Sequence, residues 1–402
     1  MNHQDILKLI EGRRPGYSLD QAFYRDPDIY QLDLDEIFLK NWLYAGHVSE
    51  IPNAGDYFLF DYANESVIII RDKNDEVYAL INVCRHRGSR VCLEQKGTAK
   101  RLMCRYHAWT YDQDGALRSA RIMPEDMDKS QLGLKKAHVR IFEGMIYINL
   151  AGDPASFDII ERELVECLRP YRLGDAKVAH RQAYYIDANW KLAVENYTEC
   201  YHCAPAHPEY SRAHALAKPD SRYTTEMTEV MSRAAACGLS GKQKLRIGLD
   251  AEVYGADYEY ERYPLLHGHL TGSKDGKPVA PLLGDLKDFD GGTTDFQVGP
   301  LVFALAYCDH VVMYRFTPLS LDKTECDITW LVNGDAIEGK NYDKENLIWL
   351  WDITTLADQK IIENNQKGVD SHFYEPGPFS EMEERTEMFL DWYRDGLKRG
   401  LS

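Results

Sequence analysis

Two pairs of cysteine and histidine residues stand close together in the first third of the chain. The segment INVCRHRGSR contains Cys84 and His86, and the segment CRYHAWTY contains Cys104 and His107. Thiolate sulfur and imidazole nitrogen are common protein ligands of transition metals. Two such pairs in two short loops predict one metal centre.

The composition of each pair bears on the identity of the metal. Two cysteines and two histidines are the usual ligands of a structural zinc site, so a zinc-stabilised module is the simplest alternative. Zinc fingers, however, pair cysteine with cysteine and histidine with histidine, whereas each pair here is mixed. In a Rieske [2Fe–2S] centre, two cysteines hold one iron and two histidines hold the other. The mixed pairs therefore favour an iron–sulfur cluster over zinc.

A second group of potential metal ligands lies in the segment NWKLAVENYTECYHCAPAHPEY. It contains Glu199, His202 and His207 in the spacing E-x-x-H-x4-H. Two imidazoles and one carboxylate with open positions form the facial triad of non-haem Fe(II) oxygenases, so His202 and His207 are predicted iron ligands. The segment also contains C-x-x-C, formed by Cys200 and Cys203, for which a thioredoxin-like redox motif is the alternative. Its position inside the iron-ligand segment argues against that alternative.

The third iron ligand must be a carboxylate from elsewhere in the chain. The predicted helix WLWDITTLADQKIIENNQKGVDS offers Asp352, Asp358 and Glu363. An acid on an inward-facing stripe of a helix needs a cation as its partner. Asp358 is the favoured third ligand because it lies on a largely apolar stripe at helical spacing. The stripe consists of Trp351, Thr355, Asp358 and Ile362.

The two cluster motifs resemble the loops of a known family. CRHRGSRVC and CRYHAWTYDQDG are similar to the two cluster-binding loops of Rieske oxygenases. The resemblance places Cys84 and Cys104 on one iron and His86 and His107 on the other. It also supports Asp358 as the third ligand of the mononuclear Fe(II), because the helix around it is similar to the iron-ligand helix of that family.

The resemblance gives Glu199 a separate role. In this family the acid before the first iron histidine connects the cluster of one subunit with the iron of its neighbour, which implies a homotrimer. Most members have Asp at this position, whereas this chain has Glu. In having Glu at this position, the chain resembles the subset of the family that acts on quaternary ammonium compounds, namely carnitine, choline, glycine betaine and stachydrine. A carboxylate here can accept hydrogen bonds from His202 and from His107 of a neighbouring copy, and so fix both tautomers.

Residue patterns divide the chain into three segments. Residues 1–42 have helical spacing and are assigned to the catalytic domain, and residues 43–152 contain short β-type runs separated by turns. Residues 153–402 mix helices and strands, including helices over the NWKLAVENYTECYH and ENLIWLWDITTLADQKIIENNQKG segments. The Gly/Pro/Asp-rich stretch 271–294 is expected to be a loop, plausible as a lid. The predicted class is α+β, with an all-β Rieske domain and, by resemblance, a helix-grip (START-like) catalytic domain with a curved antiparallel sheet.

Composition excludes several other classes of protein. The formal charge of −17 argues against nucleic-acid binding and mildly favours a small cationic substrate. The N-terminus lacks the pattern of a signal peptide, and the longest apolar runs are too short to span a membrane. Nine cysteines at irregular spacing argue against a disulfide framework. We therefore expect a cytoplasmic protein, with some cysteines as ligands and the others, such as Cys92, as buried thiols.

The substrate class is suggested by the same subset of the family. The segments GRRPGYSLDQAFYRDPDIYQLDLDEIF and NVCRHRGSRVC resemble glycine betaine and stachydrine demethylases more than arene dioxygenases. A quaternary ammonium group donates no hydrogen bond, so aromatic faces and acids should recognise it. Candidate pocket residues are Asn196 and Tyr197, which precede the iron histidines and are equally compatible with packing roles. Phe303 and Tyr307 on a predicted strand are further candidates, although such residues in small sheets more often belong to the core.

The cluster segment also suggests an electron-donating partner. Between Cys84 and His107 the only acid is Glu94, whereas seven residues are basic: Arg85, Arg87, Arg90, Lys96, Lys100, Arg101 and Arg105. A basic patch on an acidic protein predicts a docking face for an acidic partner, with Arg85 and Arg101 as candidates. The expected partner is a flavin/iron–sulfur reductase, or a ferredoxin, that passes electrons from NAD(P)H.

Together these features predict the terminal oxygenase of a Rieske-type monooxygenase. It is expected to use O2 to remove an N-methyl group from a betaine and to release formaldehyde. The enzymatic alternatives are a carnitine- or choline-type monooxygenase and an aromatic-ring dioxygenase, which would form cis-diols. The non-enzymatic alternatives are a zinc-stabilised binding module and an electron carrier, which would have no use for the second His/His/Asp set.

Overall fold

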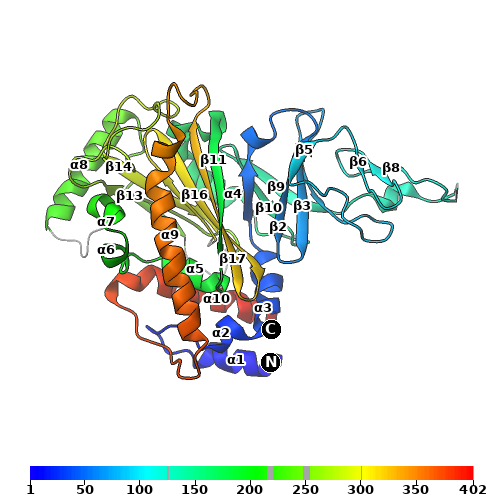
Figure 1. The fold of residues 1–402 in the computed structure, drawn as a ribbon, viewed down its shortest axis with the longest axis horizontal. Helices are drawn as coiled ribbons and strands as arrows, with labels where there is room; N and C mark the ends of the chain where they lie inside the picture. The colour runs from blue at the N-terminus through cyan, green and yellow to red at the C-terminus, as the bar shows by residue number, and fades with distance from the viewer. Residues whose placement is uncertain (125, 215–220, 248–253, 300, 402) are drawn as a thin grey trace. The chain divides into compact units, whose positions relative to one another are not determined.

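The chain folds into two compact units in a computed structural model. The structure describes residues 1–124, 126–214, 221–247, 254–299 and 301–401 (Figure 1). One unit comprises Met1–Asn41 and Ala155–Ser402, and the other comprises Trp42–Pro154. The N-terminal helices therefore belong to the same unit as the C-terminal part of the chain. Within the described residues, no helix combines the length and apolar character needed to cross a membrane.

The smaller unit consists of antiparallel strands. Its described residues form one sheet in the order β1-β10-β9-β4-β3-β2-β5 and a second of three short strands, β6-β7-β8. Strand β3 (Glu65–Arg71) is buried from Ser66 to Ile70 because its VIII run is apolar on both faces. The other strands are β1 (Leu43–His47), β2 (Asp56–Tyr62), β4 (Val77–Ile81), β5 (Lys96–Thr98), β6 (Leu102–Met103), β7 (Thr110–Tyr111), β8 (Leu117–Ser119), β9 (Lys136–Phe142) and β10 (Met145–Asn149).

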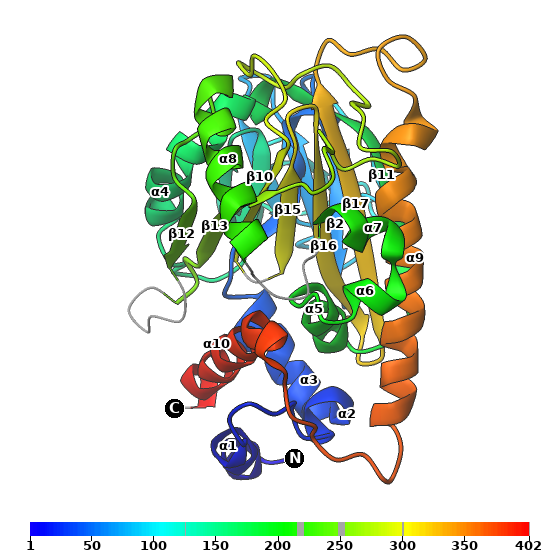
Figure 2. The same cartoon turned by 90° about the vertical axis from the view of Figure 1, so that its left-hand side faces the viewer.

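The larger unit is organised around a curved antiparallel sheet. In the described part of the chain its strand order is β11-β17-β16-β15-β14-β13-β12, and helices α5 to α9 lie along one side of it (Figure 2). The strands are β11 (Ala176–Ile186), β12 (Lys244–Ile247), β13 (Tyr258–Pro264), β14 (Gly292–Val298), β15 (Val302–Ala306), β16 (His310–Ser320) and β17 (Lys323–Asn333). The helices of this unit are α1 (His3–Gly12), α2 (Ala22–Arg25), α3 (Pro27–Asp33), the π-helical turn η1 (Leu34–Phe38), α4 (Asp158–Leu168), α5 (Trp190–Tyr197), α6 (Cys203–Ala206), α7 (Pro208–His214), α8 (Ser221–Cys237), α9 (Lys344–Val369) and α10 (Glu384–Leu401).

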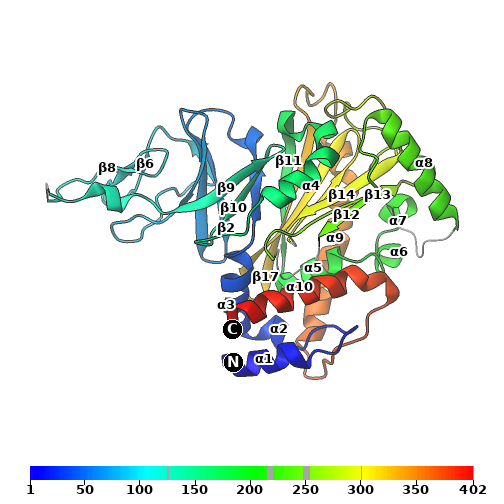
Figure 3. The same cartoon turned by 180° about the vertical axis from the view of Figure 1, so that it is seen from behind.

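A buried polar cluster fixes α5 to the N- and C-terminal helices. Asp33, at the end of α3, accepts hydrogen bonds from Trp190 Nε1 at 3.0 Å and from the Tyr393 hydroxyl at 2.6 Å, and it pairs with Lys191. Both charged side chains are fully buried, so each depends on the other for compensation. Figure 3 shows α10, which carries Tyr393, beside α3 and α5. Asp33 belongs to α3, and Trp190 and Lys191 belong to α5. The sequence analysis did not predict α8 or α10.

Helix α5 ends earlier than the sequence predicted. Asn189 caps its N-terminus by accepting from the Lys191 amide, but the helix stops at Tyr197 and does not extend through His202. The Glu199 carboxylate accepts from the backbone amides of Tyr201 and His202, and these local bonds replace helical ones. Of the iron-ligand candidates, His202 therefore lies in the turn directly before α6, and His207 directly follows the end of that helix.

Helix α9 carries the stripe that the sequence predicted. Asp343 caps its N-terminus, and the helix ends at Val369, one residue beyond the predicted stop at Gly368. Trp351, Thr355 and Ile362 are buried, whereas Asp358 on the same stripe is partly accessible. The helix packs against β11, α5 and α7, and this packing directs Asp358 toward the segment that contains the two histidines.

The segment 271–294 is irregular up to Gly291, where β14 begins at the next residue. A side chain and a backbone group anchor it: the Thr271 hydroxyl donates to Asp309 at 2.6 Å, and the Leu283 backbone amide donates to the Cys308 carbonyl at 2.8 Å. Thr271, Leu283 and Asp290 are buried. These contacts give the segment a packing role beside the sheet, and Thr293 is its member that lines the cavity described below.

Candidate active site and metal centres

The two Cys/His loops of the smaller unit have matching backbone geometry. The amide of Gly88 donates to the Cys84 carbonyl at 2.9 Å, and the amide of Ala108 donates to the Cys104 carbonyl at the same distance. Gly88 and Ala108 both have left-handed backbone conformations, with φ of +79° and +59°. Each loop therefore makes the same tight turn four residues after its cysteine.

The four side chains are arranged as a [2Fe–2S] centre requires. Cys84 and Cys104 are buried free thiols, whereas the rings of His86 and His107 lie closer to solvent, with their Nδ1 atoms 3.2 Å apart. Desolvation, with the neighbouring His86 and Arg87 charges, lowers the pKa of His107 and so favours the neutral imidazole that binds metal. The donor set thus fits a cluster with buried cysteine ligands and accessible histidine ligands.

The side chains of Tyr111 and Trp109 contact this set and hold it in place. The Tyr111 hydroxyl lies 3.2 Å from Cys84 Sγ and accepts a hydrogen bond from the Arg85 amide at 3.0 Å. The His86 ring stacks on Trp109 with centroids 4.9 Å apart. Burial and the contact with Cys84 raise the pKa of Tyr111, so its hydroxyl remains a donor for a thiolate.

The basic candidates of this unit have local partners. Arg85 Nη2 lies 3.5 Å from the Gln131 carbonyl oxygen, and Arg101 Nε lies 3.4 Å from an Asp112 carboxylate oxygen. The side chains of Arg101 and Asp112 are both exposed, so this pair is weak. Arg101 therefore remains accessible to a partner, although part of its charge is balanced by Asp112.

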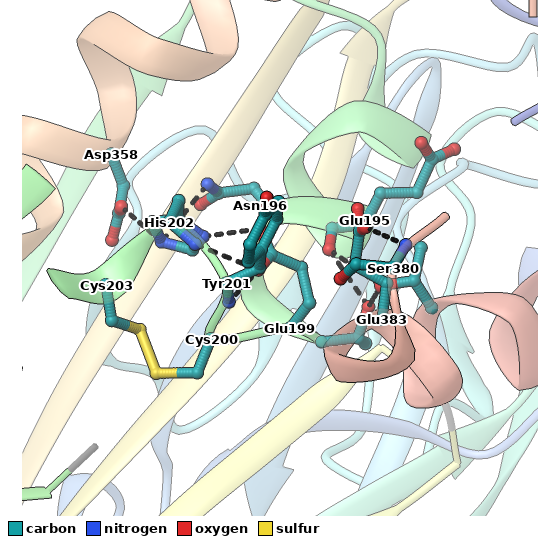
Figure 4. A network of polar contacts seen from close by, with 12 residues as sticks. Glu195, Asn196, Glu199, Cys200, Tyr201, His202, Cys203, Asp358, Ser380 and Glu383 are labelled. Carbon is teal, nitrogen blue, oxygen red and sulfur yellow. Dashed lines mark hydrogen bonds and ion pairs between the residues drawn. A yellow bond between two sulfur atoms is a disulfide. The ribbon is translucent and has the colours of Figure 1, made fainter. Parts of the chain in front are cut away.

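In the larger unit, His202, His207 and Asp358 converge on one point. His202 Nε2 lies 3.2 Å and His207 Nε2 lies 3.3 Å from the same Asp358 Oδ1 atom. His202 Nδ1 lies 2.5 Å from Glu199 Oε1, so a neutral His202 that donates there presents an Nε2 lone pair to Asp358 (Figure 4). When both imidazoles are neutral, their facing lone pairs and the carboxylate can hold a cation between them.

The electrostatics of the triad agree with this geometry. Burial lowers the pKa of His202, but the hydrogen bonds to Asp358 and Glu199 outweigh it and raise the pKa to about 9. Neither ring nitrogen of His207 has a hydrogen-bond partner among the described residues, although His207 is buried. The site therefore stabilises positive charge at this point, and the donor set fits a mononuclear iron.

Cys200 and Cys203 form a disulfide, which corrects the sequence-based expectation of free thiols in this chain. The turn after α5 brings their Cα atoms to 4.9 Å, within the range that a disulfide spans. The bridge encloses Tyr201 and His202 (Figure 4). Among the described residues the other cysteines are free and buried, as expected; they are Cys84, Cys92, Cys104, Cys167, Cys237, Cys308 and Cys326.

A cavity of about 300 Å³ adjoins the triad. Asn196 and Tyr197 line it, and Asn196 Nδ2 lies 3.5 Å from His202 Nε2. The other two pocket candidates lie behind the wall: Phe303 stacks on Tyr197 at 4.3 Å, and the Tyr307 hydroxyl lies 2.8 Å from His214 Nε2. Their burial gives Phe303 and Tyr307 supporting roles in the wall of the cavity.

Most of the cavity wall comes from residues that the sequence analysis did not single out. These residues combine aromatic rings with charged groups, and they include Tyr210, Tyr263, Tyr314, Asp295 and Arg385. Trp351, named above only as a member of the α9 stripe, also lines the cavity. Arg385 Nη1 donates to Asp295 at 3.1 Å, and its Nη2 pairs with Glu259 at 2.8 Å. The alternation of charged and aromatic residues in EYERY (residues 259–263) is typical of a strand, which the structure shows as β13. The sequence alone does not show which face of this strand contacts α10.

Comparison with known families identifies the class. The model of the ring hydroxylating alpha subunit (catalytic domain) matches residues 173–399, and the model of the Rieske [2Fe-2S] domain matches residues 41–138. The chain therefore belongs to the Rieske-type ring-hydroxylating oxygenases, which are O2-dependent oxidoreductases. The predicted fold class is confirmed. This family holds a Rieske [2Fe–2S] cluster and a mononuclear iron, and the two donor sets fit them.

Two curated relatives match nearly the whole chain, and a third matches about half of it. The glycine betaine monooxygenase oxygenase subunit of Pseudomonas aeruginosa (strain UCBPP-PA14) is 35% identical over 396 residues, covering 98% of this chain and 92% of the relative. The protein of the same name from Chromohalobacter salexigens is also 35% identical, covering 97% and 88%. The carnitine monooxygenase oxygenase subunit of Escherichia coli (strain K12) is 34% identical but covers only 48% of this chain and 53% of its own length.

Solved structures show the same fold. The quaternary ammonium Rieske monooxygenase CntA in complex with L-carnitine has a TM-score of 0.69 at 21% identity and covers 100% of this chain and 99% of its own. Naphthalene 1,2-dioxygenase from Rhodococcus sp. has a TM-score of 0.65 at 18% identity, covering 98% of both chains. At these identities the likeness concerns the architecture, which enzymes of both kinds share.

Proposed function

We propose that this chain is the oxygenase component that oxidatively N-demethylates a quaternary ammonium substrate of the glycine betaine or stachydrine type. The observation that carries the proposal is the cavity beside His202, His207 and Asp358, whose wall combines tyrosine and tryptophan rings with carboxylates. Ring faces and carboxylates attract a cation that can donate no hydrogen bond. The full-length similarity to glycine betaine monooxygenase subunits supports the same class.

The protein ligands follow from the two donor sets. Cys84 and Cys104 hold one iron of the cluster and His86 and His107 hold the other, whereas His202, His207 and Asp358 hold the mononuclear iron. When bound, the cluster supplies electrons and the mononuclear iron supplies O2 activation. This chain's own contribution is to orient the ligands and to hold the substrate's N-methyl group beside the triad.

Glu199 is the proposed link between the two centres of neighbouring subunits. Its carboxylate accepts from His202 Nδ1, and it borders both the cavity described above and a second cavity of about 290 Å³. The second cavity is lined by further acids, including Glu195 and Glu383. A histidine from another copy of the chain can reach Glu199 from this side, in keeping with a homotrimer in which electrons cross between subunits.

The electrons come from a separate protein. We assign this role to an NAD(P)H-dependent flavin/iron–sulfur reductase, or a ferredoxin, that docks near Arg85 and Arg101. Complementary charge between a basic face and an acidic partner increases the rate of encounter. Arg101 is exposed and makes only a weak surface pair, so it is free to exchange its partner.

The reaction inserts one oxygen atom from O2 into a C–H bond of an N-methyl group. The resulting N-hydroxymethyl ammonium loses a proton, and cleavage of its C–N bond releases formaldehyde and a tertiary amine. The second oxygen atom leaves as water after uptake of two electrons and two protons.

Single-turnover product analysis tests this proposal. Iron-loaded protein with a dithionite-reduced cluster is mixed with O2 and one member of a panel of quaternary amines. Formaldehyde with glycine betaine or stachydrine is the expected result, whereas oxidised protein and anaerobic samples should yield none. If only carnitine or choline yields product, the chain is a carnitine- or choline-type monooxygenase instead. Formation of cis-diols from arenes would refute the proposal.

A further inference from the structure

We propose that Asp295 provides the negative charge that selects a cationic head group in the cavity, and that Arg385 and Glu259 hold it in place. The proposal deepens the proposed function and rests on a quaternary ammonium substrate. It assigns charge selection to one side chain on β14, distinct from the metal ligands and from Glu199.

The strand register places three acids on one face of the sheet. Glu261 on β13 lies directly opposite Asp295 on β14, and Lys244 on β12 lies opposite Glu261. Glu259 is two residues before Glu261, so it shares this face. Like charges directly opposite each other on neighbouring strands destabilise a sheet unless other groups compensate them. The arrangement therefore implies that the acids serve another purpose.

The cations of this cluster do not balance its acids. Lys244 Nζ pairs with Glu261 at 3.2 Å, and Arg385 pairs with both Glu259 at 2.8 Å and Asp295 at 3.1 Å. Lys244 and Glu261 compensate each other, so among the described residues joined by the remaining ion pairs the two carboxylates of Glu259 and Asp295 share the one cation of Arg385. One negative charge therefore remains, and it lies in a region where Glu259 is buried and Asp295 is nearly so.

The uncompensated charge faces the cavity through Asp295. Asp295 and Arg385 line the cavity, whereas Glu259 and Glu261 are not among its described lining residues. Burial is the main cause that raises the pKa of the lining tyrosines Tyr197 and Tyr210, and the charge of Asp295 adds to this effect. Its field therefore extends across the aromatic wall toward the triad.

Burial makes this carboxylate responsive to a bound cation. Desolvation raises the pKa of Asp295 to about 6, although the Arg385 guanidinium acts in the opposite direction. A quaternary ammonium in the cavity adds a second positive charge and favours the ionised carboxylate. The cation cannot donate a hydrogen bond, so Coulomb attraction and ring faces supply its recognition. A neutral group of the same shape keeps its ring contacts but loses the attraction.

Matched ligands separate the charge from the shape. Choline carries a trimethylammonium group, and 3,3-dimethylbutan-1-ol carries a tert-butyl group of nearly the same shape without charge. Binding of each to the iron-loaded, oxidised protein without O2 is measured by calorimetry, directly for choline and by displacement of choline for the alcohol. We expect Asp295→Asn to weaken choline binding about tenfold and to change binding of the alcohol less than about twofold.

Two further variants complete the design. Asp295→Glu retains the charge and should restore most of the choline affinity. Glu261→Gln removes one charge from the neighbouring strand, but this carboxylate pairs with Lys244 outside the cavity, so choline binding should change little. Circular dichroism and thermal unfolding of each variant verify the fold.

Several outcomes would overturn the assignment. Unchanged choline binding in folded Asp295→Asn, equal losses for both ligands, or absence of choline binding to the wild type would each do so. A loss for glycine betaine with choline unaffected would instead place the substrate carboxylate at Arg385. The proposed function fails independently: charge-dependent binding without formaldehyde refutes demethylation alone, whereas formaldehyde at an unchanged KM in Asp295→Asn refutes this inference alone.

Discussion

Replacing Glu199 with Gln tests the proposed path of the electrons. The carboxylate accepts hydrogen bonds from His202 Nδ1 at 2.5 Å, from the His202 amide at 3.2 Å and from the Tyr201 amide. Gln keeps the shape but loses the charge and one acceptor oxygen. A hydrogen bond to a charged group contributes about 1.5–3 kcal/mol, so electron transfer should slow by about 10- to 100-fold.

The assay follows the cluster directly. Protein with a reduced cluster is mixed with O2 and glycine betaine, and the return of the oxidised cluster's visible absorption gives the rate of electron transfer. Metal analysis should show that iron content is unchanged, because Glu199 is not one of the three proposed iron ligands. Glu229→Gln removes the same charge from an exposed position on α8 and serves as the control.

The reasoning is refuted by a specific result. A rate of cluster reoxidation within about twofold of wild type, with iron content unchanged, would exclude Glu199 from the path. Loss of iron with a normal rate per bound iron would show that Glu199 only orients His202 for metal binding. Slow reoxidation with full iron content supports the bridge.

Three other variants have distinct expected outcomes. His202→Ala should abolish product formation and leave the visible spectrum of the cluster intact; loss of that spectrum would refute the partition of ligands. Charge reversal of Arg85 and Arg101 together should raise the apparent KM for the reductase several-fold with kcat and thermal stability unchanged, and a change in stability alone would exclude docking. Burial raises the pKa of Glu195 to about 8 although Tyr24 donates to it, so its contribution to stability is present below its unfolded pKa and is lost as pH rises through the folded pKa. Glu195→Gln should therefore increase Tm relative to the wild type by more at pH 8 than at pH 5. An equal difference between variant and wild type at both pH values would contradict the assigned pKa.

Part of the site could be read from short stretches of sequence. The pairs Cys84/His86 and Cys104/His107 each lie within one turn, so their ligand atoms are neighbours whatever the rest of the chain does. The same holds for His202 and His207. Asp358 lies far away in sequence, but helical periodicity placed it on an inward stripe, and the structure brings it within 3.3 Å of both histidines.

Other features depended on local competition that residue patterns do not resolve. The pattern predicted one helix through His202, whereas Glu199 satisfies the amides of Tyr201 and His202 and ends α5 at Tyr197. That turn also brings Cys200 and Cys203 into a disulfide. Side-chain bonding and helical bonding compete for the same backbone groups, and the sequence alone does not show which prevails.

The sequence by itself determined the class of protein and the chemistry of its two metal centres, because closely spaced ligands carry their geometry with them. The cavity wall was decided by tertiary structure. Glu261 meets Asp295 through strand register, and Arg385 on α10 reaches Asp295 from 90 residues further along the chain. A shift of register by one residue would turn these acids to the opposite face of the sheet. Such contacts depend on the packing of distant elements, and that packing fixes which charge the substrate meets.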